Sequence, residues 1–173
     1  MALINKVLPG YVATLWMQDD VTPTPLSDAQ LATWTGYIED IIGTTAGGLG
    51  TAGIQVPVES IPAFGADDAS ATYAVAGART GAKITTQNQV TSLTITSAWN
   101  PADPAMLQIR ADGYNGTTIR TYVIAVYDGT NTVAYAFNAR VGGLQWDMSP
   151  SAEGKFTFVI HPVGGNSYGW SND

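Results

Sequence analysis

The sequence predicts a mainly β protein, an antiparallel β-sandwich or half-barrel with one short flanking α-helix and a long irregular loop. Two observations support this fold class. Apolar and polar residues alternate with a period of two over several stretches of the second half of the chain. Only one stretch there combines helical spacing with a start and a stop signal. The length of 173 residues fits a single domain.

The first two predicted strands of the second half cover residues 91–99 and 117–127. In the first strand, Leu93 and Ile95 share one face and threonines occupy the other. The second strand is apolar on both faces, which is typical of a strand that is covered on both sides. We therefore expect packed atoms on each side of it.

A hairpin and a final strand are predicted next. The Asp-Gly pair at the start of residues 128–131 favours a hairpin turn, and residues 132–146 then form the return strand. Gly142 and Gly143 interrupt that strand and predict a bulge or bend. Residues 153–163 alternate again and are the last predicted strand.

One helix is predicted over residues 103–113. Asp103 is a suitable N-cap, Pro104 suits the first helical position, and Gly113 predicts the end of the helix. Residues at helical spacing should pack on the sheet from one side, and these are Met106, Leu107 and Arg110.

The first half of the chain is less regular. Residues 11–18 alternate as a strand, and residues 28–33 favour a helical turn that is followed by a strand through Ile42. A continuous helix also fits this stretch, although Gly36 would cost it about 1 kcal/mol. The apolar residues that fit the continuous helix are Leu31, Trp34, Ile38 and Ile41.

Residues 43–89 are too long for an ordinary connection. They contain either two irregular strands, around 54–61 and 71–84, or a long functional loop. We expect an N-terminal arm over residues 1–9 and a polar C-terminal tail over residues 164–173.

Charge is scarce and unevenly distributed. Charged residues make up 12% of the chain, about half of the usual ~25%. The formal net charge of −7 lies entirely within residues 1–68, which hold eight acids and one base, whereas residues 69–173 are balanced. A chain this acidic is not expected to bind a nucleic-acid backbone by bulk charge.

No constellation of catalytic or metal-binding residues is evident. The chain has no cysteine and one histidine, His161, which excludes thiolate chemistry and cysteine-rich or histidine-rich metal sites. The glycine pattern at residues 48–53 precedes Pro57 rather than a helix, so it is not a dinucleotide fingerprint. We expect no enzyme activity, no cofactor and no metal.

The sequence shows no targeting signal. The apolar stretch at the N-terminus is interrupted at Pro9 and is too short for a signal-peptide core. No run of residues approaches the roughly 20 apolar residues of a membrane span. We expect assembly in a cytoplasm and no membrane partner.

Several features together resemble a known family, the major tail tube proteins of long-tailed bacteriophages of the lambda-like, siphovirus type. The resemblance covers most of residues 10–163 and is best over 91–163. It rests on the order and spacing of short motifs around a Gly-rich loop, which are Ala13-Thr-Leu-Trp16, Pro25-Leu-Ser-Asp28, Trp99-Asn-Pro101 before a short helix, and Phe156-Thr-Phe-Val-Ile-His-Pro-Val163.

The resemblance implies a virion structural protein of the phage tail, assembled in the cytoplasm of the bacterial host. Family members form homo-hexameric rings that stack into a tube, and DNA passes down the lumen during ejection without being bound specifically. The partners that this implies are other copies of the chain and the tape-measure, tail-tip and tail-terminator proteins.

Three sets of residues are candidates for these contacts. Acids that we expect to line the lumen, where they would repel DNA phosphates, are Asp19, Asp20, Glu39, Asp40, Asp67 and Asp68. We expect the long loop to contact the neighbouring ring, and its candidate residues are Gly47, Gly48, Gly50, Phe64, Tyr73, Arg79 and Lys83. Residues that we expect to dock the tail are Tyr168 and Trp170.

A carbohydrate-binding or adhesin-like β-sandwich module is the alternative function. It would use exposed aromatic side chains, with Tyr114, Tyr168 and Trp170 as the candidates. Another phage structural role, such as head decoration or tail terminator, is a third possibility. Assembly into rings or tubes distinguishes the structural protein from a monomeric binding module.

Overall fold

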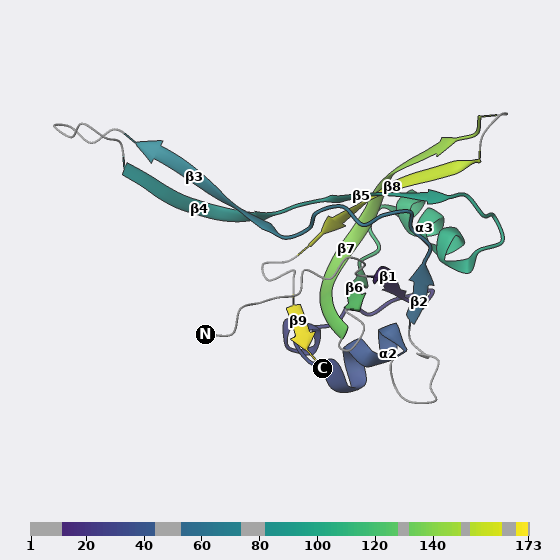
Figure 1. Ribbon diagram of the computed structural model, residues 1–173, viewed down its shortest axis with the longest axis horizontal. Coiled ribbons are helices and arrows are strands. Elements are labelled where there is room, and N and C mark those ends of the chain that lie inside the picture. The colour runs from purple at the N-terminus through teal and green to yellow at the C-terminus, as the bar shows by residue number, and fades with distance from the viewer. Residues whose placement is uncertain are drawn as a thin grey trace.

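The computed structural model describes most of the chain (Figure 1). In the strand segments 66–73, 82–90 and 169–172 it describes the backbone. The described ranges are residues 12–43, 53–73, 82–127, 132–149, 153–163 and 169–172.

Most strands belong to one seven-stranded antiparallel sheet, which confirms the mainly β prediction. Its order is β2-β1-β6-β7-β8-β5, and β9 pairs with β7. The bounds are β1 Val12–Gln18, β2 Gly53–Val56, β5 Leu93–Ala98, β6 Arg120–Tyr127, β7 Thr132–Asp147, β8 Lys155–Pro162 and β9 Gly169–Asn172.

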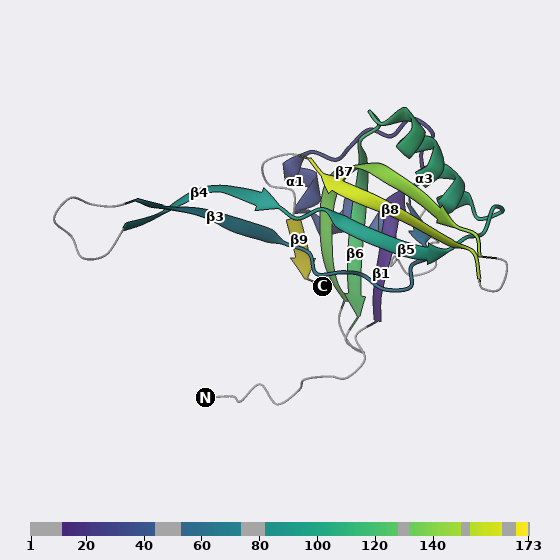
Figure 2. The same ribbon diagram turned by 90° about the horizontal axis from the view of Figure 1, so that it is seen from above.

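The long strand β7 bends the sheet back on itself. Its first half pairs with β6 and its second half pairs with β8. The register shifts between Gly142 and Gln145, and Gly143 has a φ of 61°, so the predicted bulge is confirmed. Figure 2 shows the result, because β5 and β8 lie across β1 and β6 as in a half-barrel.

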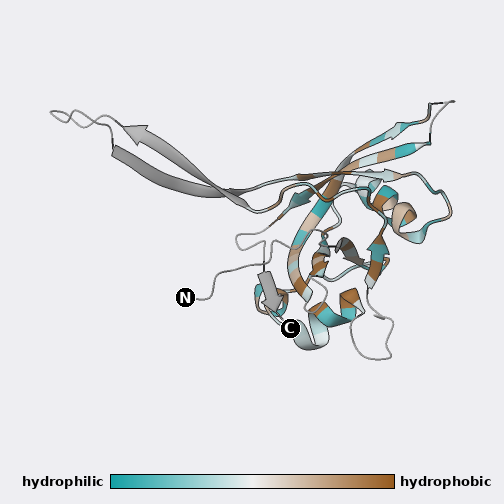
Figure 3. Cartoon of the chain, in the orientation of Figure 1, coloured by the Kyte–Doolittle hydropathy of each residue, from teal (hydrophilic) through white to brown (hydrophobic). Residues whose placement is uncertain are grey.

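The main core lies inside this bend. Apolar and polar residues alternate along β7 (Figure 3), as expected for a strand with one face in the core. Helix α3, Pro104–Asn115, closes the core with Met106 and Ile109. The largest buried side chains contributed by the strands are Leu15, Met17, Leu93, Ile95, Tyr122, Ile124, Phe137, Phe156, Phe158 and Ile160.

A second, smaller core covers the other face of β6. Three short helical segments, α1 Asp28–Leu31, η1 Trp34–Ile38 and α2 Glu39–Ile42, pack there against Val123 and Ala125. The prediction that β6 is covered on both faces is therefore confirmed. The chain itself supplies both covers, so this burial needs no neighbouring subunit.

The predicted strand through Ile42 is wrong. Residues 38–42 are helical, and a non-helical kink at Thr35 and Gly36, whose φ is 76°, precedes them. Ile38, Ile41 and Ile42 are all buried against β6 and β7. Their spacing of three and four residues places them on one face of this helix.

The start of α3 was predicted correctly, but its end was not. The Asp103 side chain accepts a hydrogen bond from the Met106 amide at 3.1 Å. The helix continues beyond Gly113 and ends before Gly116, whose φ of 68° suits the C-cap position. Gly113 instead allows close packing, because a Cβ there would lie 2.7 Å from Leu144 Cδ1.

The prediction that residues 153–163 are the last strand is also wrong. Strand β8 leaves β7 near Ala139, and β9 then pairs with the first half of β7, with Trp170 opposite Tyr135. The C-terminal tail therefore extends the edge that β8 begins. The predicted turn over residues 128–131 lies outside the described residues.

The long segment before residue 91 contains regular strands. Beyond β2, it forms a two-stranded hairpin of β3, Ala66–Tyr73, and β4, Ala82–Val90. We call this hairpin the arm, because it extends away from the rest of the fold in Figures 1 and 2. The prediction of one strand over 71–84 merged the end of β3 with the start of β4.

Candidate assembly surfaces

No catalytic centre emerges from the described part of the chain. In the described ranges, no group of three or more His, Cys, Asp or Glu side chains is arranged to hold a metal ion. His161 is exposed, and its Nδ1 atom lies 3.0 Å from the Ser92 hydroxyl. Of the helices that the structure describes, none is both long and apolar enough to span a bilayer.

A buried ion pair fixes one end of the sheet. The Arg120 Nε atom donates to Asp112 Oδ2 at 2.8 Å, and both side chains are almost fully buried. The same guanidinium donates to the backbone carbonyls of Gln18 and Asp20, the latter at 2.7 Å. It thereby joins α3, β6 and the loop that follows β1.

Tyr122 lies close to this ion pair in the main core. Burial raises the pKa of its phenol, and the nearby Asp112 carboxylate raises it further. Arg120 opposes this effect in part. The pKa of this phenol therefore lies above its ordinary value in the folded protein.

The six acids that were predicted to line a lumen lie on three separate elements. Asp19 and Asp20 are exposed just after β1, and Glu39 and Asp40 are half-buried on α2. Asp67 and Asp68 belong to β3 of the arm. Figure 1 shows α2 well away from the arm, so one subunit does not bring the α2 pair and the β3 pair together.

Residues predicted for ring-to-ring contacts lie mainly on or near the arm. Phe64 is half-buried at the base of the arm, where its ring meets that of Tyr135 edge-on at a centroid distance of 5.0 Å. Tyr73 ends β3, and Lys83 lies opposite Thr72 in β4. The other candidates, which lie outside the described residues, are Gly47, Gly48, Gly50 and Arg79.

Of the two predicted tail-docking residues, Tyr168 lies outside the described residues. Trp170 belongs to β9, whose backbone pairs with β7 of the same chain. The backbone of residues 169–172 thus forms its hydrogen bonds within the sheet of the same chain.

Sequence reasoning missed an aromatic cluster at the far end of β7. Trp146 lies against Trp99, with a centroid distance of 5.9 Å, and the Tyr114 ring stacks on Trp146 at 6.4 Å. Tyr114 is 72% exposed. These three residues are distant in sequence, and the bend of the sheet around α3 brings them together. No pattern in the sequence indicates this cluster.

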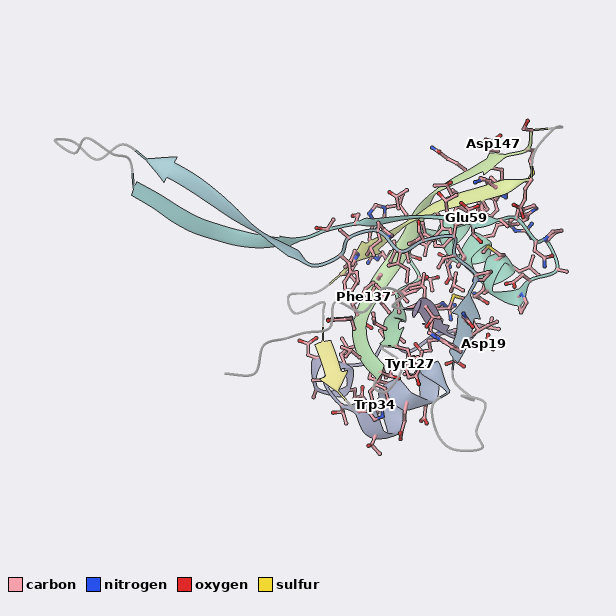
Figure 4. All side chains as sticks on the ribbon, viewed as in Figure 1. Asp19, Trp34, Glu59, Tyr127, Phe137 and Asp147 are labelled. Atoms are coloured by element: carbon pink, nitrogen blue, oxygen red, sulfur yellow. The ribbon has the colours of Figure 1, made fainter. Side chains whose placement is uncertain are left out.

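The surface also has an open hollow near the end of β1, where Figure 4 labels Asp19 just after the strand. It encloses about 400 Å³ between two loops, residues 21–25 and 115–119. Its lining is neutral and includes Val21, Pro23, Pro25 and Ile119. Exposed Asp19 and Asp20 lie next to it in the chain.

Comparison with known proteins identifies structures but no sequence family. No family model matches the chain, and no curated protein matches it. A chain in the cryo-EM structure of the anti-feeding prophage baseplate, 6-fold symmetrised, is similar at a TM-score of 0.65 and 11% identity, over 97% of both chains.

Two further solved structures are similar along most of their length. One is a chain in the cryo-EM structure of an extracellular contractile injection system, PVC sheath/tube terminator in the extended state, with a TM-score of 0.58, 12% identity and coverage of 98% and 99%. The other is a chain in the cryo-EM structure of the anti-feeding prophage cap, a tube-terminating cap, with a TM-score of 0.52, 13% identity and coverage of 100% and 95%. The chain thus has the fold of components of phage-tail-like particles.

Proposed function

We propose that this chain is a structural subunit of a phage-type tail, forming homo-hexameric rings that stack into the tail tube of a siphovirus-type phage. The observation that carries the proposal is the shared fold, which extends over 97% to 100% of this chain in structures of a baseplate, a tube terminator and a cap.

The arm and the low charge support self-assembly. A two-stranded hairpin is only marginally stable in water by itself, so an arm that projects from its own subunit is stabilised when it packs on a neighbour. Surfaces with few charged residues are also suited to protein contacts. The chain has 12% charged residues, which fits a subunit whose outer surfaces are largely covered after assembly.

The negative charge suits a conduit. A wall that carries acids repels phosphate, so that DNA passes without adhering. We propose that acids among the three pairs after β1, on α2 and on β3 contribute to this wall. A cryo-EM map of the tube in which all six carboxylates point away from the lumen would overturn this assignment.

The position within the tail is a finer question. The family resemblance favours the tube itself, with the tape-measure, tail-tip and tail-terminator proteins as partners and the virion as the site of action. The similar solved structures include a terminator and a cap. A terminal subunit would form a single ring that does not extend, whereas a tube subunit forms stacks of variable length.

Negative-stain electron microscopy and sedimentation velocity of the purified protein, over a wide range of concentration, test the proposal. Hollow tubes support the tube subunit, and isolated rings support a terminal ring. Compact monomers at every concentration, also after addition of tail tips purified from the phage that encodes the chain, would contradict both.

Carbohydrate binding remains the second candidate, because Tyr114 is 72% exposed and its ring is held by Trp146. A planar, preorganised aromatic surface suits stacking on a sugar ring. A glycan array with the wild-type protein and Tyr114→Ala tests this candidate. Binding that disappears in the variant would favour the module, whereas no binding by the wild type would exclude it.

A further inference from the structure

The hollow beside Asp19 has a rigid wall. The loop that follows β1 has no regular secondary structure over residues 19–27, yet hydrogen bonds tie it to the sheet at several points. The bonds are Arg120 Nη1 to the Asp20 carbonyl at 2.7 Å, Gln18 Nε2 to the Thr24 carbonyl at 3.2 Å, the Leu26 amide to Thr121 Oγ1 at 3.0 Å, and Asn138 Nδ2 to the Leu26 carbonyl at 2.7 Å.

This fixed loop presents an apolar residue to solvent. Val21 is 87% exposed and lines the hollow with Pro23 and Pro25. Proline limits the backbone, so the loop loses little conformational entropy when a partner binds. A preorganised apolar surface of this kind is typical of a binding site rather than of a simple connection.

The charge next to the hollow is negative. Asp19 and Asp20 are exposed beside Val21, and the nearby Arg120 is already neutralised by Asp112. A partner that fits this site is therefore apolar with a positive charge.

The N-terminal segment of the same sequence has this composition. Residues 1–11 contain four aliphatic side chains larger than alanine and no acid, and Lys6 is the single base within residues 1–68. The aliphatic residues are Leu3, Ile4, Val7 and Leu8. The segment thus complements the hollow both in hydrophobicity and in charge.

The position of β1 argues that the segment comes from a second copy. The segment joins β1 at Val12, whereas the hollow lies beyond Gln18, about 20 Å away along the strand. Strand β6 pairs with β1 from Val12 to Met17 on one edge, β2 pairs with Leu15 to Gln18 on the other, and the two cores cover the faces of this second half. The segment would therefore have to pass around β2 or β6 to reach the hollow of its own copy.

We propose that residues 1–11 of one copy bind in the hollow of the next copy, with the aliphatic side chains against Val21 and the prolines and Lys6 beside Asp19 and Asp20. This inference deepens the proposed function, on which it rests, because it names a contact that joins subunits. The donor and the acceptor lie at opposite ends of β1, so the contact is head-to-tail and can be repeated from subunit to subunit.

Disulfide trapping tests the contact directly, because the chain has no native cysteine. Protein carrying Val7→Cys is mixed with protein carrying Thr22→Cys, and the mixture is oxidised. We expect a covalent heterodimer that forms at least tenfold faster than with Thr94→Cys, a control at an exposed position on β5. A rate equal to the control would overturn the inference, as would an intrachain disulfide in the Val7→Cys, Thr22→Cys double variant at high dilution.

Charge reversal gives a second readout. Lys6→Glu, or Asp19→Lys with Asp20→Lys, should lower the assembled fraction at least tenfold, and the combination of the three should restore much of it. Rings or tubes from the wild type without trapping would contradict only this inference. Trapped heterodimers without rings or tubes would contradict only the proposed function.

Discussion

At the scale of single residues, the ion pair of Arg120 and Asp112 is the interaction whose loss should destabilise the fold most. Both side chains are almost fully buried, so Arg120→Met leaves a buried carboxylate without its partner. We expect a loss of about 3–5 kcal/mol in the free energy of unfolding, measured by urea denaturation. Asp112→Ala should have an effect of similar size.

The exposed pair of Lys155 and Glu59 provides the control for this prediction. Its Nζ–Oε1 distance is 3.1 Å, close to that of the buried pair, but both side chains are substantially exposed. Lys155→Met should therefore cost no more than about 1 kcal/mol. Equal losses in the Arg120 and Lys155 variants would refute the explanation by burial.

Tyr122 makes stability depend on alkaline pH. Burial raises the pKa of its phenol in the folded protein, whereas in the unfolded chain the phenol ionises at about pH 10. Above that pH the unfolded state binds fewer protons than the folded state, so stability falls as pH rises.

Tyr122→Phe should reduce this alkaline loss. Within the described structure the Tyr122 hydroxyl is buried without a hydrogen-bond partner, so its removal should change stability at pH 7 by less than about 1 kcal/mol. Denaturation curves of both proteins between pH 7 and about pH 11 measure the difference. Parallel pH profiles would mean that Tyr122 ionises normally in the folded protein.

Gly113 and Gly116 illustrate what sequence cannot decide at the residue scale. Either glycine can end a helix, and the first was predicted to do so. The helix continues through Gly113, where an added Cβ would lie 2.7 Å from Leu144 Cδ1, thirty-one positions away in the sequence. Only the tertiary contact distinguishes a glycine that packs from one that adopts positive φ.

At the scale of elements, the arm is the part of the fold that should serve assembly alone. Ala66 and Val90 are opposite each other in register at its base, so Asn-Gly can replace residues 67–89 as a two-residue hairpin turn. We expect the thermal midpoint of this variant to remain within a few degrees of the wild-type value and assembly to be lost. Circular dichroism and electron microscopy measure the two properties.

The end points of this deletion decide whether the rest of the fold stays intact. A deletion of residues 47–68 would remove β2 with the buried Val56 and also Phe64, which packs against the main core. Loss of assembly would then reflect damage to the fold. Tubes formed by the 67–89 variant would contradict a role of the arm in assembly.

Sequence-based prediction succeeded for strands whose pattern of apolar residues fits only one kind of element. Alternation identified β1, β5, β7 and β8, and the apolar pattern of β6 indicated two covers. It failed over residues 34–42, because apolar residues there satisfy both a strand and a helix until the small residues of β6 and β7 select helical packing. It also missed the hollow, which exists only where two distant loops meet.

At the scale of the whole molecule, net charge should control assembly. Each copy carries −7 at neutral pH, so subunits that approach one another repel through their overall charge. Salt screens this repulsion, because the Debye length falls from roughly 30 Å at 0.01 M to about 8 Å at 0.15 M. Backbone pairing and apolar contacts are hardly weakened over this range.

We therefore expect the assembled fraction, at fixed protein concentration, to rise when NaCl increases from about 0.01 to about 0.15 M. Sedimentation velocity measures the fraction, and the Lys6→Glu variant, with a net charge more negative by two, should require more salt than the wild type. A fraction that falls with salt would mean that ionic contacts between subunits outweigh their mutual repulsion. The acidic first part of the chain would then form an interface with basic surfaces rather than a wall that DNA passes.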